Sequence, residues 1–158
     1  MTINSTSWNG EYVIEVHDVG KETVVISLHN TIHSAGRTML RNVLSGTVTD
    51  GQLKYLALGS SNASISVGDT TLGAETFRKA ITSQSNFSAF ELLSSTTILD
   101  TEANGQIEEI GIFAGSTASA TANTGIMVSR ILYSKLKTSS ESLQIKRYDN
   151  ITDSTATL

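Results

Sequence analysis

Alternation of apolar and polar side chains predicts β-structure in the first part of the chain. In residues 12–16 every second side chain, beginning with Tyr12, is large and apolar, and residues 24–28 repeat this pattern. A short segment that contains Gly20 separates the two runs, so together they predict a β-hairpin. We expect Trp8, which precedes the hairpin, to pack on its edge.

The next segment carries the only helical pattern of the chain. Apolar side chains recur at helical spacing at Ile32, Ala35, Met39, Leu40 and Val43. Asn30 or Thr31 can cap this helix with a side-chain oxygen, and Gly46 stands where a left-handed residue ends many helices. Gly36 lies inside the helix at a cost of about 1 kcal/mol relative to alanine, so we expect a strand to cross closely there.

The centre of the chain predicts a strand, a long loop and a second strand. Residues 55–58 are apolar on both faces, which suits a strand covered on both sides, and Gly59 ends it. Residues 60–68 have few large side chains and predict a surface loop. A turn and a second strand follow, and they carry Asp69, Leu72, Gly73, Glu75, Phe77, Arg78 and Ile81.

The second half of the chain predicts further strands. Strand patterns occupy residues 87–99, 107–113, 126–136 and 143–148. Gly111, in the second of these strands, indicates a bulge or a close backbone approach. Residues 115–125 are almost entirely Ala, Ser, Thr, Asn and Gly. Because such residues bury little apolar surface, this segment predicts a mobile loop.

Together these elements predict a mainly β protein of the α+β class. We expect an antiparallel β-sandwich of about eight strands with one α-helix packed against it. The sequence divides into an N-terminal arm and hairpin at residues 1–29, a sandwich domain at residues 30–148, and a polar C-terminal tail at residues 149–158. We expect the tail to be free or to extend onto a neighbouring subunit.

Composition narrows the classes of function. The chain of 158 residues contains no cysteine and no proline, and only 16% of it is charged, which suits β-structure with neutral polar faces. The formal net charge of −4 disfavours a nucleic-acid partner, because nucleic acids are bound by clustered cations. No apolar run is long enough to span a membrane, and the N-terminus lacks the basic and apolar regions of a signal peptide.

The motifs of the sequence assemble no reactive centre. No serine lies in a Gly-x-Ser-x-Gly elbow, and no phosphate-binding loop follows Gly59. His29 and His33 are four apart, a metal-binding spacing on one helix, but His29 closes a strand, so we expect exposed polar positions. Loop carboxylates such as Asp69 match no EF-hand spacing. The sequence therefore predicts neither an enzyme nor a bound cofactor or metal.

Three motifs in a fixed order give the chain a resemblance to virion proteins. They are Leu58-Gly59 at a strand end, Leu72-Gly73-Ala74-Glu75-Thr76-Phe77-Arg78 after the loop, and Glu109-Ile110-Gly111-Ile112-Phe113 in a later strand. With the helix before them, these segments resemble the small tail-structural proteins of tailed bacteriophages and the N-terminal attachment domain of phage tail-collar fibre proteins. The resemblance covers residues 30–148, and no fibre shaft follows, so we expect a stand-alone module.

The resemblance implies a structural role in a phage virion. We expect a homo-oligomer, a trimer or a ring, made in the host cytoplasm. It would bind copies of itself and other tail proteins in the baseplate, the collar or adaptor, or a fibre-attachment ring. The residues expected to serve assembly or structure are Gly59, Asp69, Leu72, Glu75, Arg78, Glu109, Gly111, Phe113 and Arg130.

Glu75 and Arg78 carry a more specific hypothesis. Residues three apart on a regular strand face opposite sides, so we expect these two to pair with other residues, namely Arg130 and Glu109. The alternative is two solvated surface charges.

Two other functions stay open. A capsid decoration protein has the same β-rich, oligomeric character. A carbohydrate-binding adhesion module would need exposed aromatic side chains, for which Trp8 is the first candidate.

Overall fold

The computed structural model describes the backbone of residues 2–157 and the side chains of residues 7–152. Within this part of the chain there are nine strands and one helix. They are β1 (Thr2–Asp18), β2 (Val24–Asn30), α1 (Ser34–Leu44), β3 (Leu53–Gly59), β4 (Glu75–Ala80), β5 (Ser83–Ser88), β6 (Glu91–Ile98), β7 (Gly105–Ala114), β8 (Ile126–Lys137) and β9 (Glu141–Thr157).

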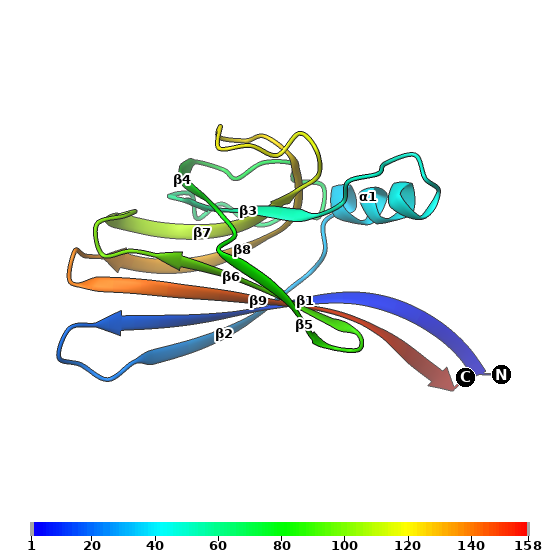
Figure 1. Cartoon of the computed structure of the whole chain (residues 1–158), viewed down its shortest axis with the longest axis horizontal. Helices are drawn as coiled ribbons and strands as arrows, with labels where there is room; N and C mark the ends of the chain where they lie inside the picture. The colour runs from blue at the N-terminus through cyan, green and yellow to red at the C-terminus, as the bar shows by residue number, and fades with distance from the viewer. Residues whose placement is uncertain (1, 158) are drawn as a thin grey trace.

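The strands form two antiparallel sheets that lie one over the other (Figure 1). The five-stranded sheet has the order β2-β1-β9-β6-β5, and the four-stranded sheet has the order β4-β3-β7-β8. The chain passes from the smaller sheet to the larger one between β4 and β5, and α1 lies at one end of the smaller sheet (Figure 1). The predicted mainly β sandwich with one helix is therefore confirmed.

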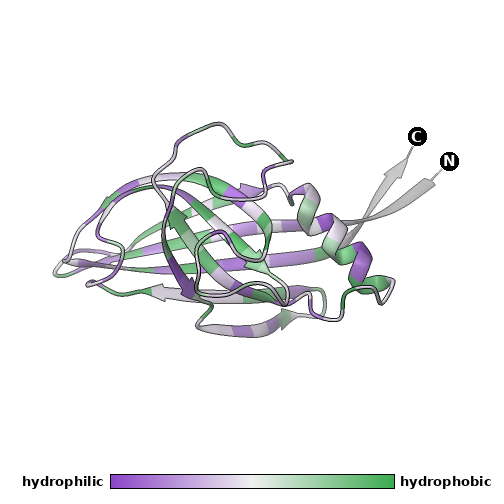
Figure 2. Cartoon of the chain, turned by 90° about the horizontal axis from the view of Figure 1, so that it is seen from above, coloured by the Kyte–Doolittle hydropathy of each residue, from purple (hydrophilic) through white to green (hydrophobic). Residues whose placement is uncertain are grey.

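Apolar side chains from the facing sides of the two sheets fill the space between them. Tyr12 and Ile14 of β1 are fully buried there, and they face Leu58 of β3 and Ile110 of β7 across the core. Figure 2 shows the alternation of apolar and polar residues along the strands that produces this arrangement. The β1–β2 hairpin predicted from the alternation is confirmed, with Tyr12 opposite Leu28.

A polar cluster crosses this core and joins the two sheets. Arg147 of β9, which is 1% exposed, donates hydrogen bonds from Nε and Nη2 to the Asp149 carboxylate at 2.8 and 2.7 Å. Its Nη1 donates to the Tyr12 hydroxyl at 2.9 Å and to the Ser129 hydroxyl of β8. Burial raises the pKa of the Tyr12 hydroxyl above its ordinary value, so this group stays protonated.

Trp8 belongs to the same cluster. Its indole Nε1 donates to Asp149 Oδ1 at 2.8 Å, and Trp8 lies within β1, whose pairing with β9 places it opposite Ile151. The expectation that Trp8 packs on the edge of the hairpin was wrong, because β1 continues past the hairpin and its Trp8 side chain reaches a buried carboxylate.

Helix α1 begins later than the sequence predicts. The residue before it, His33, makes no side-chain capping hydrogen bond, so the expected caps at Asn30 and Thr31 were wrong. The His33 N–H instead donates to the Val128 carbonyl at 2.8 Å, which fixes the start of the helix to β8. Gly46 after the helix has a φ of 71°, which confirms the predicted left-handed residue.

The expected strand crossing at Gly36 is confirmed. A Cβ atom on Gly36 would lie 3.1 Å from Val128 Cα and 3.2 Å from the Val128 carbonyl oxygen. These are backbone atoms of a buried strand, so they have little freedom to move away. Only glycine lets the helix approach β8 this closely.

The structure corrects the strand pattern in two places. Residues 83–88 form β5, which the sequence missed because this segment has a single large apolar side chain, Phe87. The predicted strand at residues 87–99 is divided, because residues 87 and 88 end β5 and β6 runs from Glu91 to Ile98. The segment at residues 149–158, expected as a tail, belongs to β9 as far as Thr157.

The arm and hairpin at residues 1–29 and the end of the chain form one sheet. β1 pairs with β9 from Thr2 opposite Thr157 to Asp18 opposite Glu141. The two ends of the chain are therefore not separate appendages, as the sequence predicted. They form β1 and β9, two long neighbouring strands inside the larger sheet. α1, the only helix of residues 2–157, lacks the length and apolar character needed to cross a membrane.

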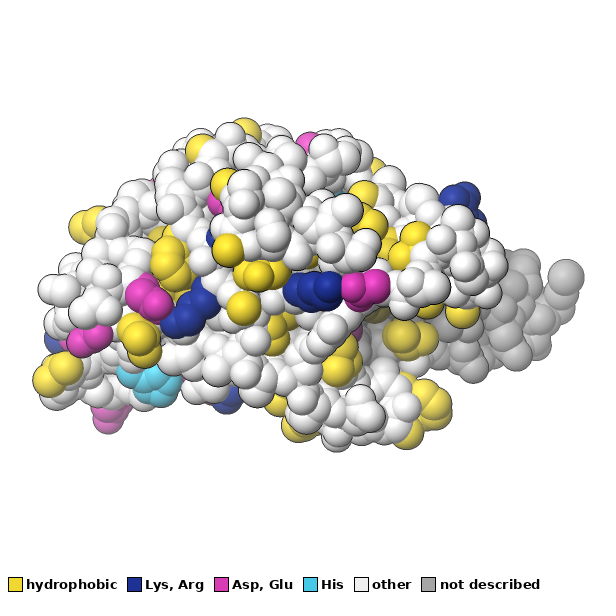
Figure 3. All heavy atoms as spheres, turned by 45° about the horizontal axis from the view of Figure 1, so that its top comes forward, with side chains coloured by type: hydrophobic (Ala, Val, Ile, Leu, Met, Phe, Trp, Pro, Cys, Tyr) yellow, Lys and Arg dark blue, Asp and Glu magenta, His cyan; other side chains and the backbone are white. Residues whose placement is uncertain are grey.

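Charged side chains on the surface lie mostly in pairs of opposite sign. Lys54 Nζ is 2.6 Å from Asp50 Oδ2, and Lys79 Nζ is 2.6 Å from Glu102 Oε2. Figure 3 shows such dark blue and magenta side chains in contact on one face. The hydrogen bond from Lys79 holds the pKa of Glu102 below its ordinary value.

The close approach at Gly36 can be tested by filling it. Gly36→Val should lower the free energy of unfolding by about 1–3 kcal/mol, because the added methyl groups press on the β8 backbone. Thr38→Val, on the exposed side of the same helix, should change it by less than about 0.5 kcal/mol. Urea unfolding measures both, and equal effects would show that α1 does not pack on β8 at this point.

Candidate functional site

The residues expected to serve assembly lie together on the outer face of the smaller sheet, which points away from the larger sheet. Gly59 of β3 stands opposite Glu75 of β4 on one side and Glu109 of β7 on the other. Gly111 of β7 stands opposite Arg130 of β8. Two long loops, residues 60–74 and 115–125, connect these strands.

The carboxylate of Glu109 is the centre of the first half of this site. It is fully buried and accepts a hydrogen bond from Arg130 Nε at 2.6 Å. It also accepts backbone N–H bonds from Ala74 at 2.8 Å, Gly73 at 3.0 Å and Ser61 at 3.4 Å. These four donors satisfy the oxygens of the buried carboxylate with charge-assisted hydrogen bonds.

Arg130 binds the rest of the same loop. Its side chain is 3% exposed, and Nη2 donates to the Ala63 carbonyl at 3.0 Å. Nη1 donates to the Ser64 carbonyl at 3.4 Å and to Asp69 Oδ2 at 3.3 Å. The Glu109–Arg130 pair thus contacts both ends and the middle of the 60–74 loop.

Small residues make room for these contacts. A Cβ atom on Gly59 would lie 2.3 Å from Glu109 Oε1 and 2.6 Å from the Ala74 carbonyl oxygen, so any side chain there would displace the carboxylate. A Cβ atom on Gly111 would lie 2.8 Å from Leu72 Cδ2. Leu72 is buried in a second, smaller apolar cluster with Phe113. The predicted close approach at Gly111 is therefore made by a side chain of the loop.

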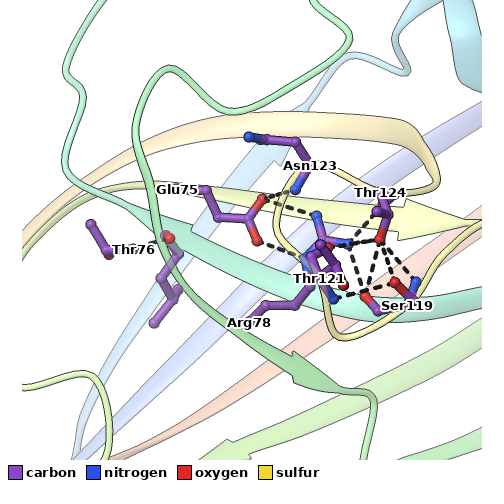
Figure 4. A network of polar contacts seen from close by, with 8 residues as sticks. Glu75, Thr76, Arg78, Ser119, Thr121, Asn123 and Thr124 are labelled. Carbon is purple, nitrogen blue, oxygen red and sulfur yellow. Dashed lines mark hydrogen bonds and ion pairs between the residues drawn. The ribbon is translucent and has the colours of Figure 1, made fainter.

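Glu75 and Arg78 pair with each other, so the expectation that they face opposite sides was wrong. Arg78 Nε donates to Glu75 Oε1 at 2.6 Å and Nη2 donates to Glu75 Oε2 at 2.9 Å (Figure 4). The reason is a bulge: the β3–β4 register shifts between Leu58 and Gly59, and Thr76 is the extra residue. One extra residue returns Glu75 to the face of Arg78.

The Glu75–Arg78 pair fixes the second loop. Arg78 Nη1 donates to the carbonyls of Thr124 at 2.7 Å and Ser119 at 3.2 Å, and Glu75 Oε2 accepts the Asn123 N–H at 2.9 Å (Figure 4). The Arg78 guanidinium also lies 4.1 Å above the ring centroid of Phe113. The 115–125 segment is thus bound to the sheet by polar contacts within the single chain, although it lacks large apolar side chains.

The two halves of the site have the same arrangement of a buried ion pair under a loop. In each, a buried carboxylate accepts loop N–H groups, and the arginine paired with it donates to loop carbonyls. Apart from the bonds within each pair, the hydrogen bonds of these side chains go to the covering loops, so the arrangement holds surface loops in one conformation. Among the described residues no group of three or more His, Asp or Glu side chains is placed to bind a metal ion.

His33 differs from its expected exposed position. Its ring is fully buried, and Nδ1 lies 3.2 Å from the Asp69 carbonyl. His29 lies in β2, so the two imidazoles do not share a helix. The strand and helix assignments of the sequence could not show this, because the 60–74 loop covers His33 only in the folded molecule.

The polar cluster of Arg147 is the main feature that the sequence interpretation missed. Arg147 and Asp149 follow Leu143 and Ile145 at intervals of two, so strand periodicity alone puts them on the buried face. The strand predicted at residues 143–148 ends before Asp149, so the prediction did not include the partner of Arg147.

Comparison with known proteins found no matching family model, no matching curated protein and no matching solved structure.

The Glu109–Arg130 pair should contribute strongly to stability. Arg130→Met leaves a buried carboxylate without its cation and should lower the free energy of unfolding by roughly 3–5 kcal/mol. The double variant Glu109→Gln with Arg130→Met removes the uncompensated charge and should be less destabilised than Arg130→Met alone. Lys21→Met, which removes the cation of an exposed pair, should have little effect. Equal losses in all variants of a urea series would refute the role of this pair.

Each loop should depend on its own arginine. Arg130→Met should increase hydrogen exchange in residues 60–74 and leave residues 115–125 protected, whereas Arg78→Met should do the reverse. Exchange measured by mass spectrometry on both variants distinguishes local release from general destabilisation. Loss of protection in both loops with either variant would contradict the separate attachment.

Proposed function

We propose that the protein is a structural component of a tailed-phage virion that acts by protein–protein assembly in the tail. Its place would be the baseplate, the collar or adaptor, or a fibre-attachment ring, as a homo-oligomer that also contacts other tail proteins. The resemblance of the three motifs supports this function. Glu75, Arg78 and Glu109 of these motifs, with Arg130, build the two buried ion pairs that hold the loops of one face in place, and interfaces that move little on binding are common in preorganised complexes.

The observation that carries the proposal is a two-stranded ribbon at one end of the molecule. β2 pairs with β1 only from Gly10 to Val16, and β6 pairs with β9 only as far as Asn150. The Ile151 N–H also donates to the Phe90 carbonyl at 2.9 Å. Beyond this residue β1 and β9 pair only with each other, and their ends lie side by side away from the sandwich (Figure 1). A two-stranded ribbon is marginally stable alone, and strands of neighbouring subunits can support it.

A second exposed edge agrees with assembly. β2 is an edge strand of the larger sheet, it contains no charged residue, and Val24 and Val25 are more than half exposed. Proteins usually protect such edges with charges, proline or a covering segment. An uncharged edge of this kind is suited to pairing with another chain in a symmetric assembly.

One observation favours a second candidate, a carbohydrate-binding adhesion module. Phe87 is 60% exposed and its ring meets that of Tyr148 edge to face, with centroids 5.2 Å apart. This pair is a better stacking surface than Trp8, whose indole nitrogen is bonded to Asp149. A glycan-array signal that disappears in Phe87→Ala and persists in Trp8→Phe would support this candidate.

The proposed assembly predicts a mass and a location. Light scattering of the full chain should give a mass several times the subunit mass of 16.8 kDa. Gold-labelled antibodies against the protein should mark the tails of the phage particles that contain it. Label on capsids would indicate a decoration protein, and a strictly monomeric protein absent from particles would refute the proposal.

Hydrogen exchange can show whether the ribbon takes part in assembly. Backbone amides of residues 2–9 and 152–157 should exchange slowly in the oligomer and quickly after dilution to monomers, because neighbouring strands support the ribbon only in the assembly. Amides of β7, in the centre of the smaller sheet, are the internal control and should be protected in both states. Equal exchange of the ribbon in both states would contradict its role.

A further inference from the structure

One end of the apolar core opens to solvent in a groove of about 840 Å³ between α1, the β5–β6 turn and the ribbon. Met39 and Leu53, which are nearly fully buried, line this groove together with the half-buried Trp8. Phe90 of the turn stands at its margin and is 69% exposed. A concave, mainly apolar surface of this size is typical of a binding site.

The exposed side of α1 next to this groove is basic. Arg37 and Arg41 are one helical turn apart, and their guanidinium groups contact only neutral oxygens, those of Ser34 at 3.4 Å and Asn42 at 2.9 Å. The other Lys and Arg side chains of residues 7–152 contact a carboxylate or, for Lys137, are buried among neutral oxygens. These two arginines therefore differ from the paired charges elsewhere on the described surface.

Apolar side chains connect the groove to the two arginines. Leu40 lines the groove. Arg37 lies three residues before Leu40 and Leu44 lies four residues after it, so both are neighbours of Leu40 on the helix surface. Leu44 is 80% exposed. Glu91 and Asp149 also line the groove, and Asp149 is buried and bonded to Arg147 and Trp8. The face that a partner meets thus changes from mainly apolar in the groove to basic along α1.

We propose that this groove binds an acidic amphipathic helix of another protein. The apolar face of that helix fills the groove, and its carboxylates contact Arg37 and Arg41. A helix satisfies its own backbone hydrogen bonds, so it can enter an apolar groove through side-chain contacts alone. Charge complementarity then sets its orientation and selects it over neutral or basic segments.

The charge of the chain favours a different protein over a second copy as the occupant. α1 is the only helix of residues 2–157, and residues 30–49 contain no Asp or Glu. Two copies of α1 would bring arginines together and repel each other. This binding site does not depend on the virion function proposed above, because it needs only the fold of one chain.

Trp8 supplies a direct measurement, because it is the only tryptophan of the chain and lines the groove. The probe is a synthetic peptide without aromatic residues that carries leucine at i, i+3, i+4 and i+7 and glutamate along one flank. A matched peptide has lysine at every glutamate position. The glutamate peptide should change the fluorescence of Trp8 with saturation, and the lysine peptide should bind about tenfold more weakly.

Two variants separate the charged and apolar contributions. Arg37→Glu with Arg41→Glu should reverse the preference between the two peptides, whereas Lys21→Glu, an exposed lysine elsewhere on the surface, should leave it unchanged. Phe90→Asp should weaken the binding of both peptides. Circular dichroism confirms that each variant is folded, which is expected because all these side chains are largely exposed. The preference should also shrink as salt is raised.

Several results would overturn the proposal. These are equal binding of the two peptides, no binding of either, and an unchanged preference in the double arginine variant. Saturation of the Trp8 signal by laurate alone would assign the groove to an acyl chain instead. Dissociation of a homo-oligomer by Phe90→Asp would show that a second copy fills the groove.

Discussion

The outer face of the smaller sheet depends on two buried pairs of carboxylate and guanidinium. Removing such charges from water is costly, and a pair is retained only where hydrogen bonds satisfy the remaining atoms. In this protein the backbone of a loop supplies those bonds: residues 60–74 surround Glu109 and Arg130, and residues 115–125 surround Glu75 and Arg78. Pair and loop are therefore stable only together.

This dependence explains how a chain poor in large side chains covers a sheet. The two loops consist mostly of small polar residues, so apart from Leu72, which is buried against Phe113, burial of apolar surface contributes little to their position. Charge-assisted hydrogen bonds, which are stronger than neutral ones, replace it. As a result the loops lie on the sheet in one arrangement, and the surfaces left for partners are the strand edges, the ribbon and the groove beside α1.

The core contains a third buried pair of carboxylate and guanidinium, Asp149 and Arg147. Arg147 joins β9 to Ser129 of the opposite sheet, and Asp149 balances its charge. Burial alone would lower the pKa of Arg147, but the adjoining Tyr12 and Asp149 oxygens raise it above its ordinary value. A charged side chain in this place tolerates few alternative packings, so the cluster favours a single alignment of the two sheets.

The sequence by itself determined the class of the fold and most of its elements. Alternation located the β1–β2 hairpin and the buried face of Tyr12, and glycine placed the end of α1 at Gly46 and the crossing at Gly36. These features follow from the spacing of apolar side chains in helices and strands and from the backbone preferences of single residues. Both can be read directly from the sequence. The residues expected to serve assembly or structure are far apart in the sequence, and the fold brings them to the outer face of the smaller sheet and the loops that cover it.

Only the tertiary structure decided how those residues are paired and where the sheets end. A one-residue bulge at Thr76 reversed the side on which Glu75 lies, and strand periodicity cannot indicate a bulge that depends on a partner strand. β5 and the last part of β9 have few apolar residues, so their strand structure comes from pairing with other strands, β5 with the adjacent β6 and β9 with the distant β1. Backbone pairing of this kind leaves no periodic signal in the sequence, and it is what holds these parts in place.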